Sequence, residues 1–334
     1  MHSRIQNPLQ RTLLENWQRD FPLVPRPFAE IGRRIGADET AVIEALKALS
    51  ASGAISRVGG VVRPNTLGAS TLAAIAAPDL AITEVAGILT KEPGVNHVYL
   101  RENEVNLWFV VTGPDRDYVD VVLKRLEKKT GLPVLGLRLE KAYHIDLGFA
   151  LSGENIAQRQ KALPDFTPAE FSPQEGDREL VQTLTDGLPL VSAPFIEVSE
   201  RLGRDESVVL GRLEELVAKG IVPRIGVIVR HRALGWRSNA MVVWDVPGGS
   251  IDEAGAKLAA ASGINLCYRR TRYTREWPFN LYCMIHARSR EEAFGILERA
   301  SNQADLAGLP RRILFSLNCF KQTGALLAPP KEAA

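Results

Sequence analysis

The segment from Tyr268 to Leu281, YRRTRYTREWPFNL, has the strongest chemical character in the chain, because arginines and aromatic residues are interspersed along it. Four of its residues are arginines, and a guanidinium group can bind a carboxylate through two parallel hydrogen bonds. Tyrosine and tryptophan offer flat faces against which a ring can pack. A planar ligand with several carboxylates suits this combination. A solvated basic hairpin and a surface that stacks RNA bases are the alternatives.

Two histidines have neighbours that could support proton transfer. His144 lies within KAYHIDLGF, residues 141–149, and His286 ends the stretch NLYCMIH, residues 280–286. A histidine titrates near neutral pH and can pass on a proton or bind a metal. A lone histidine is also often a structural residue whose hydrogen bonds are made within the protein. His97 and His231 have no neighbours in the sequence comparable to those of His144 and His286.

These candidates belong to a chain that repeats itself. Residues 21–36, FPLVPRPFAEIGRRIG, align with residues 188–203, LPLVSAPFIEVSERLG, and eight of sixteen positions are identical. The same offset of 167 residues aligns Arg57 with Arg224 and Gly59 with Gly226. Chance does not keep one register over that length, so the chain is a tandem duplication.

Each copy begins with the pattern of three helices and a wing. In the first copy, Gly36 suits the end of one helix and Asp38 suits the N-cap of the next. Residues 55–63 alternate around Gly59 and Gly60, which predicts a small β-hairpin. Three helices followed by a hairpin predict a winged helix-turn-helix.

The third helix of each head is poorly suited to reading DNA. Residues 38–50 carry three acidic side chains and the single cation Lys47, and residues 205–219 are also acidic or neutral in balance. Contacts to phosphates supply most non-specific affinity for DNA and require cations. The fold alone favours a transcription regulator, but these helices argue against one, and we expect no nucleic-acid partner.

Four arginines of the expected wings recur in both copies. They could be solvated charges that protect edge strands, or they could contact an anion held between the head and the sheet. These residues are Arg57, Arg63, Arg224 and Arg230.

After each head, the periodicity predicts the order βαββαβ, which is the ferredoxin-like plan. The fold class is therefore α+β, with two such modules that could pair within the chain as a pseudo-dimer. The expected segments are a head at 1–66, a ferredoxin-like half at 67–151, a linker at 152–177, a second head at 178–233 and a second half at 234–327.

Composition excludes several classes of protein. Apolar residues make up 45% of the chain and charged residues 24%, with a formal net charge of +2, which is typical of a soluble globular protein. The three cysteines have no spacing typical of a zinc site or a disulfide framework. The sequence shows no apolar run of membrane-spanning length and no signal peptide, so we expect a cytoplasmic protein without a membrane partner.

The run KAYHIDLGF in the first copy, and the runs RTRYTREWPFNLYCMIH and FKQTGA in the second, resemble those of the siroheme decarboxylases. These are Lrp/AsnC-like proteins of haem d1 and alternative haem biosynthesis. The resemblance covers nearly the whole chain and is greatest to members in which a NirD-like and a NirL-like half are fused. It implies a carboxy-lyase that removes CO₂ from the C12 and C18 acetates of siroheme and gives 12,18-didecarboxysiroheme.

This resemblance gives the candidate residues specific roles. Arg270, Arg272, Lys321 and Arg230 would hold substrate carboxylates, Tyr273 and Trp277 would orient the macrocycle, and Asn280 would position a carboxylate or a water. His144 is the first candidate for proton donor and His286 the second, although His144 could instead bind the siroheme iron.

Siroheme would be the substrate and would bring its own iron, so no separate cofactor or metal is expected. A regulator that senses a small molecule and a tetrapyrrole carrier are the alternatives to the enzyme. A requirement for NirG- or NirH-like partner subunits stays open, as does a homodimer of the duplicated chain.

Overall fold

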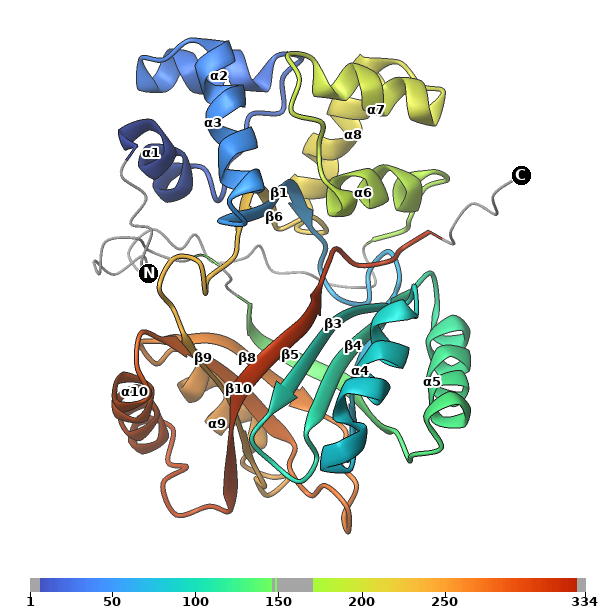
Figure 1. The fold of residues 1–334 in the computed structure, drawn as a ribbon, viewed down its shortest axis with the longest axis vertical. Helices are drawn as coiled ribbons and strands as arrows, with labels where there is room; N and C mark the ends of the chain where they lie inside the picture. Colours follow the sequence, from blue (N-terminus) through green and yellow to red (C-terminus); the bar gives the residue numbers. More distant parts are fainter. Residues whose placement is uncertain (1–6, 146–147, 149–170, 329–334) are drawn as a thin grey trace.

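The computed structural model describes residues 7–145, 148 and 171–328. Most of the expected linker, residues 152–170, lies outside these ranges, as do Asp146, Leu147 and Phe149 of the histidine motif. The described chain forms two layers, with a helical head layer above a β-barrel flanked by helices (Figure 1). Both layers contain elements from both copies, so the repeats are interleaved rather than separate along the chain.

The head layer holds three helices from each copy, as the periodicity predicts. In the first copy, Asp38 caps α3 by accepting a hydrogen bond from the Ala41 N–H at 2.8 Å, and Gly36 ends α2 with a φ of 72°. The buried side chains of both heads form one shared hydrophobic core. The helices are α1 (Pro8–Asn16), α2 (Pro27–Ile35) and α3 (Glu39–Ala51), then α6 (Asp177–Asp186), α7 (Pro194–Leu202) and α8 (Glu206–Ala218).

The wing corrects the expectation of a hairpin. Residues 55–61 form a single strand, β1 (Ile55–Val61), which pairs antiparallel with β6 (Arg224–Val229) of the other copy. Gly59 lies opposite Gly226 in this ribbon. A Cβ on Gly59 would lie 2.2 Å from the Leu184 carbonyl oxygen. The hairpin prediction is wrong because the glycines permit close packing against the other copy instead of forming a turn.

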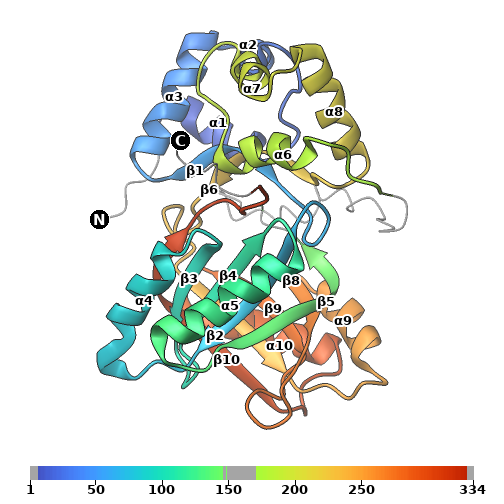
Figure 2. The same ribbon diagram turned by 90° about the vertical axis from the view of Figure 1, so that its right-hand side faces the viewer.

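The lower layer contains the two βαββαβ halves, as expected. The first half runs β2 (Ala69–Ile75), α4 (Ile82–Lys91), β3 (Val95–Arg101), β4 (Leu107–Gly113), α5 (Arg116–Thr130) and β5 (Leu135–Ile145). The second runs β7 (Ser238–Trp244), α9 (Ile251–Ala259), β8 (Ile264–Arg270), β9 (Leu281–Ala287), α10 (Arg290–Gln303) and β10 (Arg311–Gln322). Seen after a 90° turn, α4 and α5 lie on the outer face of their sheet (Figure 2).

The two sheets join edge to edge into one closed barrel with the order β10-β3-β4-β2-β5-β8-β9-β7. The long strands β5 and β10 make both joins. Residues 135–138 of β5 pair with β2 of the same copy, and residues 139–145 pair with β8 of the other. β10 does the same with β7 and β3. Closure removes the free edges that each half would otherwise expose.

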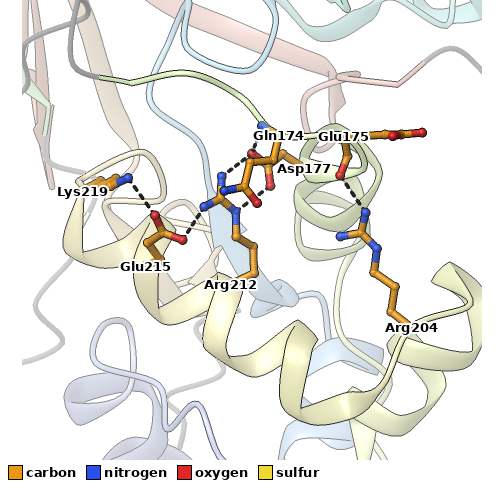
Figure 3. Close-up of polar contacts among 7 residues, drawn as sticks. All are labelled: Gln174, Glu175, Asp177, Arg204, Arg212, Glu215 and Lys219. Atoms are coloured by element: carbon orange, nitrogen blue, oxygen red, sulfur yellow. Dashed lines mark hydrogen bonds and ion pairs between the residues drawn. The ribbon is translucent and has the colours of Figure 1, made fainter.

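A buried ion pair holds the second head together. Arg212 on α8 donates from Nε and from one terminal nitrogen to the Asp177 carboxylate, at 2.8 and 2.7 Å (Figure 3). The side chains of the two residues are 7% and 1% exposed. Asp177 also accepts a hydrogen bond from the Gln174 N–H. Its carboxylate is therefore bound both by a guanidinium group and by the backbone that precedes α6.

No helix in the described ranges combines the length and the apolar character needed to cross a bilayer.

Candidate functional site

The barrel interior is filled at one end and hollow at the other. In the filled part, Trp277 packs against Trp108 and Phe279, with ring centroids 5.1 and 5.0 Å apart. The hollow part is a cavity of about 330 Å³, within the usual size range of ligand pockets. Strands from both copies line it, and Val61, Ile228 and Val229 of the β1–β6 ribbon contribute from the head layer.

Three arginines line this cavity, the buried Arg101 and Arg224 and the partly buried Arg270. Two of them occupy equivalent positions in the two copies, Arg101 at the end of β3 and Arg270 at the end of β8. Each of these two guanidinium groups lies over the ring of the tyrosine two residues earlier, at 5.4 Å from Tyr99 and 5.1 Å from Tyr268. The Nε of each of these two arginines is buried and has no hydrogen-bond partner among the described residues. A buried donor of this kind favours an oxygen-rich ligand.

The ionisable side chains of the described cavity lining are all basic or tyrosine and cysteine, with no carboxylate among them. This described lining contains arginines and histidines but no aspartate or glutamate. Burial lowers the pKa of Arg101 to about 10 and also lowers the pKa of Arg270. Removing a cation from water without an anionic partner is costly, so bound carboxylates would relieve this cost.

Three histidines also line the cavity: His97, His231 and His286. Burial, with Arg57 as a smaller influence, lowers the pKa of His97 to about 4, and burial together with Arg232 and Arg101 does the same to His231. The rings of His231 and His286 meet edge to face, with centroids 4.7 Å apart. Burial therefore keeps these histidines neutral at pH 7.

The hydrogen bonds around His286 define its tautomer. Arg101 donates to Asn239 Oδ1 at 3.3 Å, so the Asn239 amide group presents its N–H to His286 Nε2 at 2.9 Å. The His286 Nε2 atom must then accept, which places the proton on Nδ1, 3.1 Å from Asn265 Oδ1. Burial, with His231 and Arg101 adding to it, holds the pKa of His286 well below its usual value.

The neutral histidines predict a loss of stability in acid. Between about pH 6.5 and 4 the unfolded chain protonates its histidines while the native cavity does not, so the free energy of unfolding falls as the pH falls. Replacing His97 with leucine, the residue at the equivalent position 266, should remove roughly 3 kcal/mol of this dependence. Denaturation in urea at several pH values measures the free energy of unfolding of both proteins. If it depends on pH equally in the variant and the unmodified chain, His97 is not a source of this dependence.

Of the residues proposed from the sequence, the structure brings Arg270, His286 and the wing arginine Arg224 into the cavity. Trp277 is buried in the filled part of the barrel, and its indole N–H donates to the Tyr282 hydroxyl at 2.8 Å. Asn280 is buried on the backbone of Val246, donating to its carbonyl and accepting from its N–H, both at 2.9 Å. Asn106 binds Ala77 in the same way in the first copy, so this amide has a structural role.

Four other residues expected to touch the ligand are not in the described lining. Arg272 is exposed and paired with Asp245 at 2.5 Å, and the Tyr273 hydroxyl donates to the Gly136 carbonyl at 3.3 Å. Arg230 is exposed, and Lys321 donates to the carbonyls of Thr90 and Glu92 at the end of α4.

His144 lies on β5, half-buried and opposite Cys267 of β8. Lys321 occupies the matching position on β10, opposite Val98 of β3. Cys267 and Val98 are both buried beneath helices on the outer face of the barrel. The described lining of the cavity does not include His144.

Sequence reasoning missed Arg101, Tyr99 and the contact between His231 and His286. Arg101 could have been found, because Tyr99 and Arg101 match Tyr268 and Arg270 in the repeat. The pairing of the histidines had no such signal, because it depends on how the β1–β6 ribbon sits over the barrel.

Two family models match the chain, each of them twice. The AsnC-like ligand binding domain matches residues 66–144 and 233–321. The siroheme decarboxylase NirDL-like HTH domain matches residues 10–55 and 177–222.

Full-length relatives agree with these models. The siroheme decarboxylase NirDL subunit of Paracoccus pantotrophus is 48% identical over 96% of this chain and 97% of its own. A crystal structure of the siroheme decarboxylase NirDL matches with a TM-score of 0.66 and 26% identity, covering 95% of this chain and 93% of that one. The same enzyme in complex with an iron-uroporphyrin III analogue matches with a TM-score of 0.65 and 25% identity over 94% and 92% of the chains.

Proposed function

The chain belongs to the siroheme decarboxylase family of Lrp/AsnC-like proteins, and from this we propose that its barrel cavity is where siroheme loses CO₂. It is a siroheme decarboxylase and therefore a carboxy-lyase. The finer proposal is that the C12 and C18 acetates react, giving 12,18-didecarboxysiroheme. The heads, in this proposal, serve to roof the cavity rather than to bind DNA.

The observation that carries the proposal is the equivalent pair Arg101 and Arg270, whose Nε atoms are both buried, in a cavity whose described lining has no acidic residue. Siroheme is flat, largely apolar in its ring and rich in carboxylates around its edge. Guanidinium groups can bind those carboxylates at about 1.5–3 kcal/mol per charged hydrogen bond. The rings of Tyr99 and Tyr268 lie beneath the two guanidinium groups at cation–π distance, which favours the positions that these groups hold.

The reaction needs a proton but no electrons from outside. The bond between the methylene carbon and the carboxylate carbon breaks, CO₂ leaves, and the pyrrole ring takes up the electron pair. A proton then returns to the methylene carbon and completes a methyl group. We therefore propose that no cofactor is required beyond the substrate, whose iron stays in the macrocycle.

The chain's own groups would promote this step in two ways. Apolar lining such as Leu72, Met241 and Met284 removes water from the reacting carboxylate, which favours its loss as neutral CO₂. The arginines hold carboxylates that do not react. We propose His286, in contact with His231, as the proton donor, because the substrate's negative charge would raise the pKa of a histidine that burial otherwise keeps neutral.

The remaining candidates keep distinct proposed roles. His144, the first choice from sequence, is the competing proton donor or iron ligand, and it is tested against His286 below. Arg272, Tyr273, Trp277, Asn280 and Lys321 would act through the architecture around the cavity, given the protein contacts that each makes. Arg230 is exposed and would have no direct contact with bound substrate.

Anaerobic incubation of the purified chain with siroheme, followed by mass spectrometry of the extracted tetrapyrrole, tests the function. We expect loss of the mass of one and then two CO₂ molecules. Slow turnover that NirG- or NirH-like proteins accelerate would reveal a need for partner subunits. Tight binding with an unchanged mass, even with such partners, would contradict the enzyme and favour a carrier. Binding to duplex DNA that weakens with salt would favour a regulator.

A further inference from the structure

The cavity has a pseudo-twofold axis that the two copies create. Equivalent strands follow one another half a turn apart around the barrel, β3 with β8, β4 with β9, β2 with β7 and β5 with β10. In the ribbon above, Gly59 lies opposite Gly226, its own repeat equivalent. The axis therefore runs along the barrel and passes between these two glycines.

The arginines obey this symmetry in their contacts. Arg101 donates to the carbonyl of Leu314 at 3.1 Å, and Arg270 donates to the carbonyl of Leu137 at 3.1 Å. Leu137 and Leu314 are themselves equivalent, because β5 pairs with β2 in the register in which β10 pairs with β7. Each arginine thus reaches across the join between the sheets, and its Nε has no hydrogen-bond partner among the described residues.

The titratable groups break the symmetry that the arginines keep. The cavity face of β3 presents His97, Tyr99 and Arg101, whereas that of β8 presents Leu266, Tyr268 and Arg270. On the neighbouring strand, His286 occurs in the second copy only, because its equivalent in the first copy is Thr112. Arg101 and Arg270 therefore form a symmetric pair, whereas the possible proton-transfer groups are not symmetric, and Arg224 lines the cavity without its repeat equivalent Arg57.

The order of side chains on the substrate contains a matching local symmetry. In the type III arrangement of uroporphyrin, which siroheme shares, ring D is reversed. Propionates at C13 and C17 flank the C15 bridge, and acetates at C12 and C18 lie beyond them. A twofold axis through C15 exchanges the two propionates and the two acetates. In the type I isomer the same axis exchanges an acetate with a propionate.

We propose that the pseudo-twofold axis of the barrel coincides with this local axis of the macrocycle, and that Arg101 and Arg270 together select the type III isomer. Each arginine, stacked on its tyrosine, binds the equivalent carboxylate on ring C or on ring D. Because the two arginines have similar surroundings, they require like side chains at equal distances from the axis, which the type III order supplies and the type I order does not. The inference rests on the proposed tetrapyrrole site but concerns its selectivity, not the reaction.

The test compares the affinities of iron-uroporphyrin III and iron-uroporphyrin I for the full chain by absorbance titration. We expect the unmodified protein to prefer the type III compound by about tenfold to a hundredfold, the value of one charged hydrogen bond. Arg101→Gln and Arg270→Gln should each remove most of this preference by weakening type III binding. Arg138→Gln should retain it, because Arg138 is exposed and paired with Asp120 at 2.8 Å.

Each other result overturns the proposal. Equal affinities of the unmodified protein for the two isomers would show that the cavity does not read the order of side chains, even if either arginine variant failed to fold. A preference that survives both substitutions, or that depends on one arginine only, would exclude a symmetric pair. Decarboxylation of siroheme could still be observed in every one of these cases. Failure of this proposal is therefore distinguishable from failure of the proposed function.

Discussion

Replacing His286 with glutamine is expected to lower the rate of decarboxylation by about 10²–10⁴-fold while siroheme still binds. Glutamine can keep a hydrogen bond to Asn239, which contacts His286 Nε2 at 2.9 Å, but it cannot carry a proton to the methylene carbon. The loss should therefore appear in single-turnover rates at saturating siroheme. Absorbance of the bound tetrapyrrole checks that the cavity is intact.

His144→Ala is the matched comparison, because it tests the other histidine that the sequence singled out. We expect turnover close to that of the unmodified chain, since His144 pairs with β8 opposite the helix-covered Cys267. The reverse outcome, with a slow His144 variant and an active His286 variant, would return the donor role to His144. A change in the absorbance of bound siroheme in the His144 variant alone would instead indicate an iron ligand.

The modular plan could be predicted from the sequence because its signals are local. Helix caps such as Asp38, stops such as Gly36 and the change from helical to alternating periodicity each depend on a few neighbouring residues. Closure of the barrel could not be predicted in this way. It depends on which sheet edges meet, and β5 pairs with the other copy along its last part, which continues to Ile145.

The prediction of a β-hairpin at residues 55–63 was wrong for a related reason. A pair of glycines within an alternating stretch is typical of a turn, but it is equally compatible with close backbone packing. Only the position of Leu184 against Gly59, contributed by the other copy, decides between the two. Such a contact between repeats leaves no mark in the sequence of either repeat alone.

The candidate site was predicted in part, because residue type indicates chemistry but strand alternation decides which side chains face the cavity. Arg270 faces inward at the end of β8, whereas Arg272, in the loop beyond the strand, is exposed. Arg101 was overlooked because its surroundings, RENEV, balance its charge, whereas Arg270 lies in an unusually basic run. Comparing the copies position by position identifies both arginines.

Replacing Asp177 with alanine should cost about 3–5 kcal/mol of folding free energy, the largest stability effect expected outside the cores. The substitution leaves the Arg212 guanidinium, whose side chain is 7% exposed, without its buried carboxylate. Hydrogen bonding to Asp177, more than to Glu215, raises the pKa of Arg212 in the native chain. An arginine stays protonated near pH 7 even without that carboxylate, so loss of its charge cannot relieve the cost. Equilibrium denaturation in urea measures the change.

Glu215→Ala is the control, because Glu215 binds the same arginine with a side chain that is 41% exposed (Figure 3). An exposed pair contributes at most about 1 kcal/mol, so this variant should be nearly as stable as the unmodified chain. Replacing Asp177 and Arg212 together with apolar residues should recover much of the loss, because no unpaired charge is then buried. Equal losses for Asp177→Ala and Glu215→Ala would contradict a dominant role of burial.

The Asp177 variant should also bind siroheme less tightly at temperatures near its unfolding transition. The reason is that both heads share one core and the β1–β6 ribbon covers the cavity.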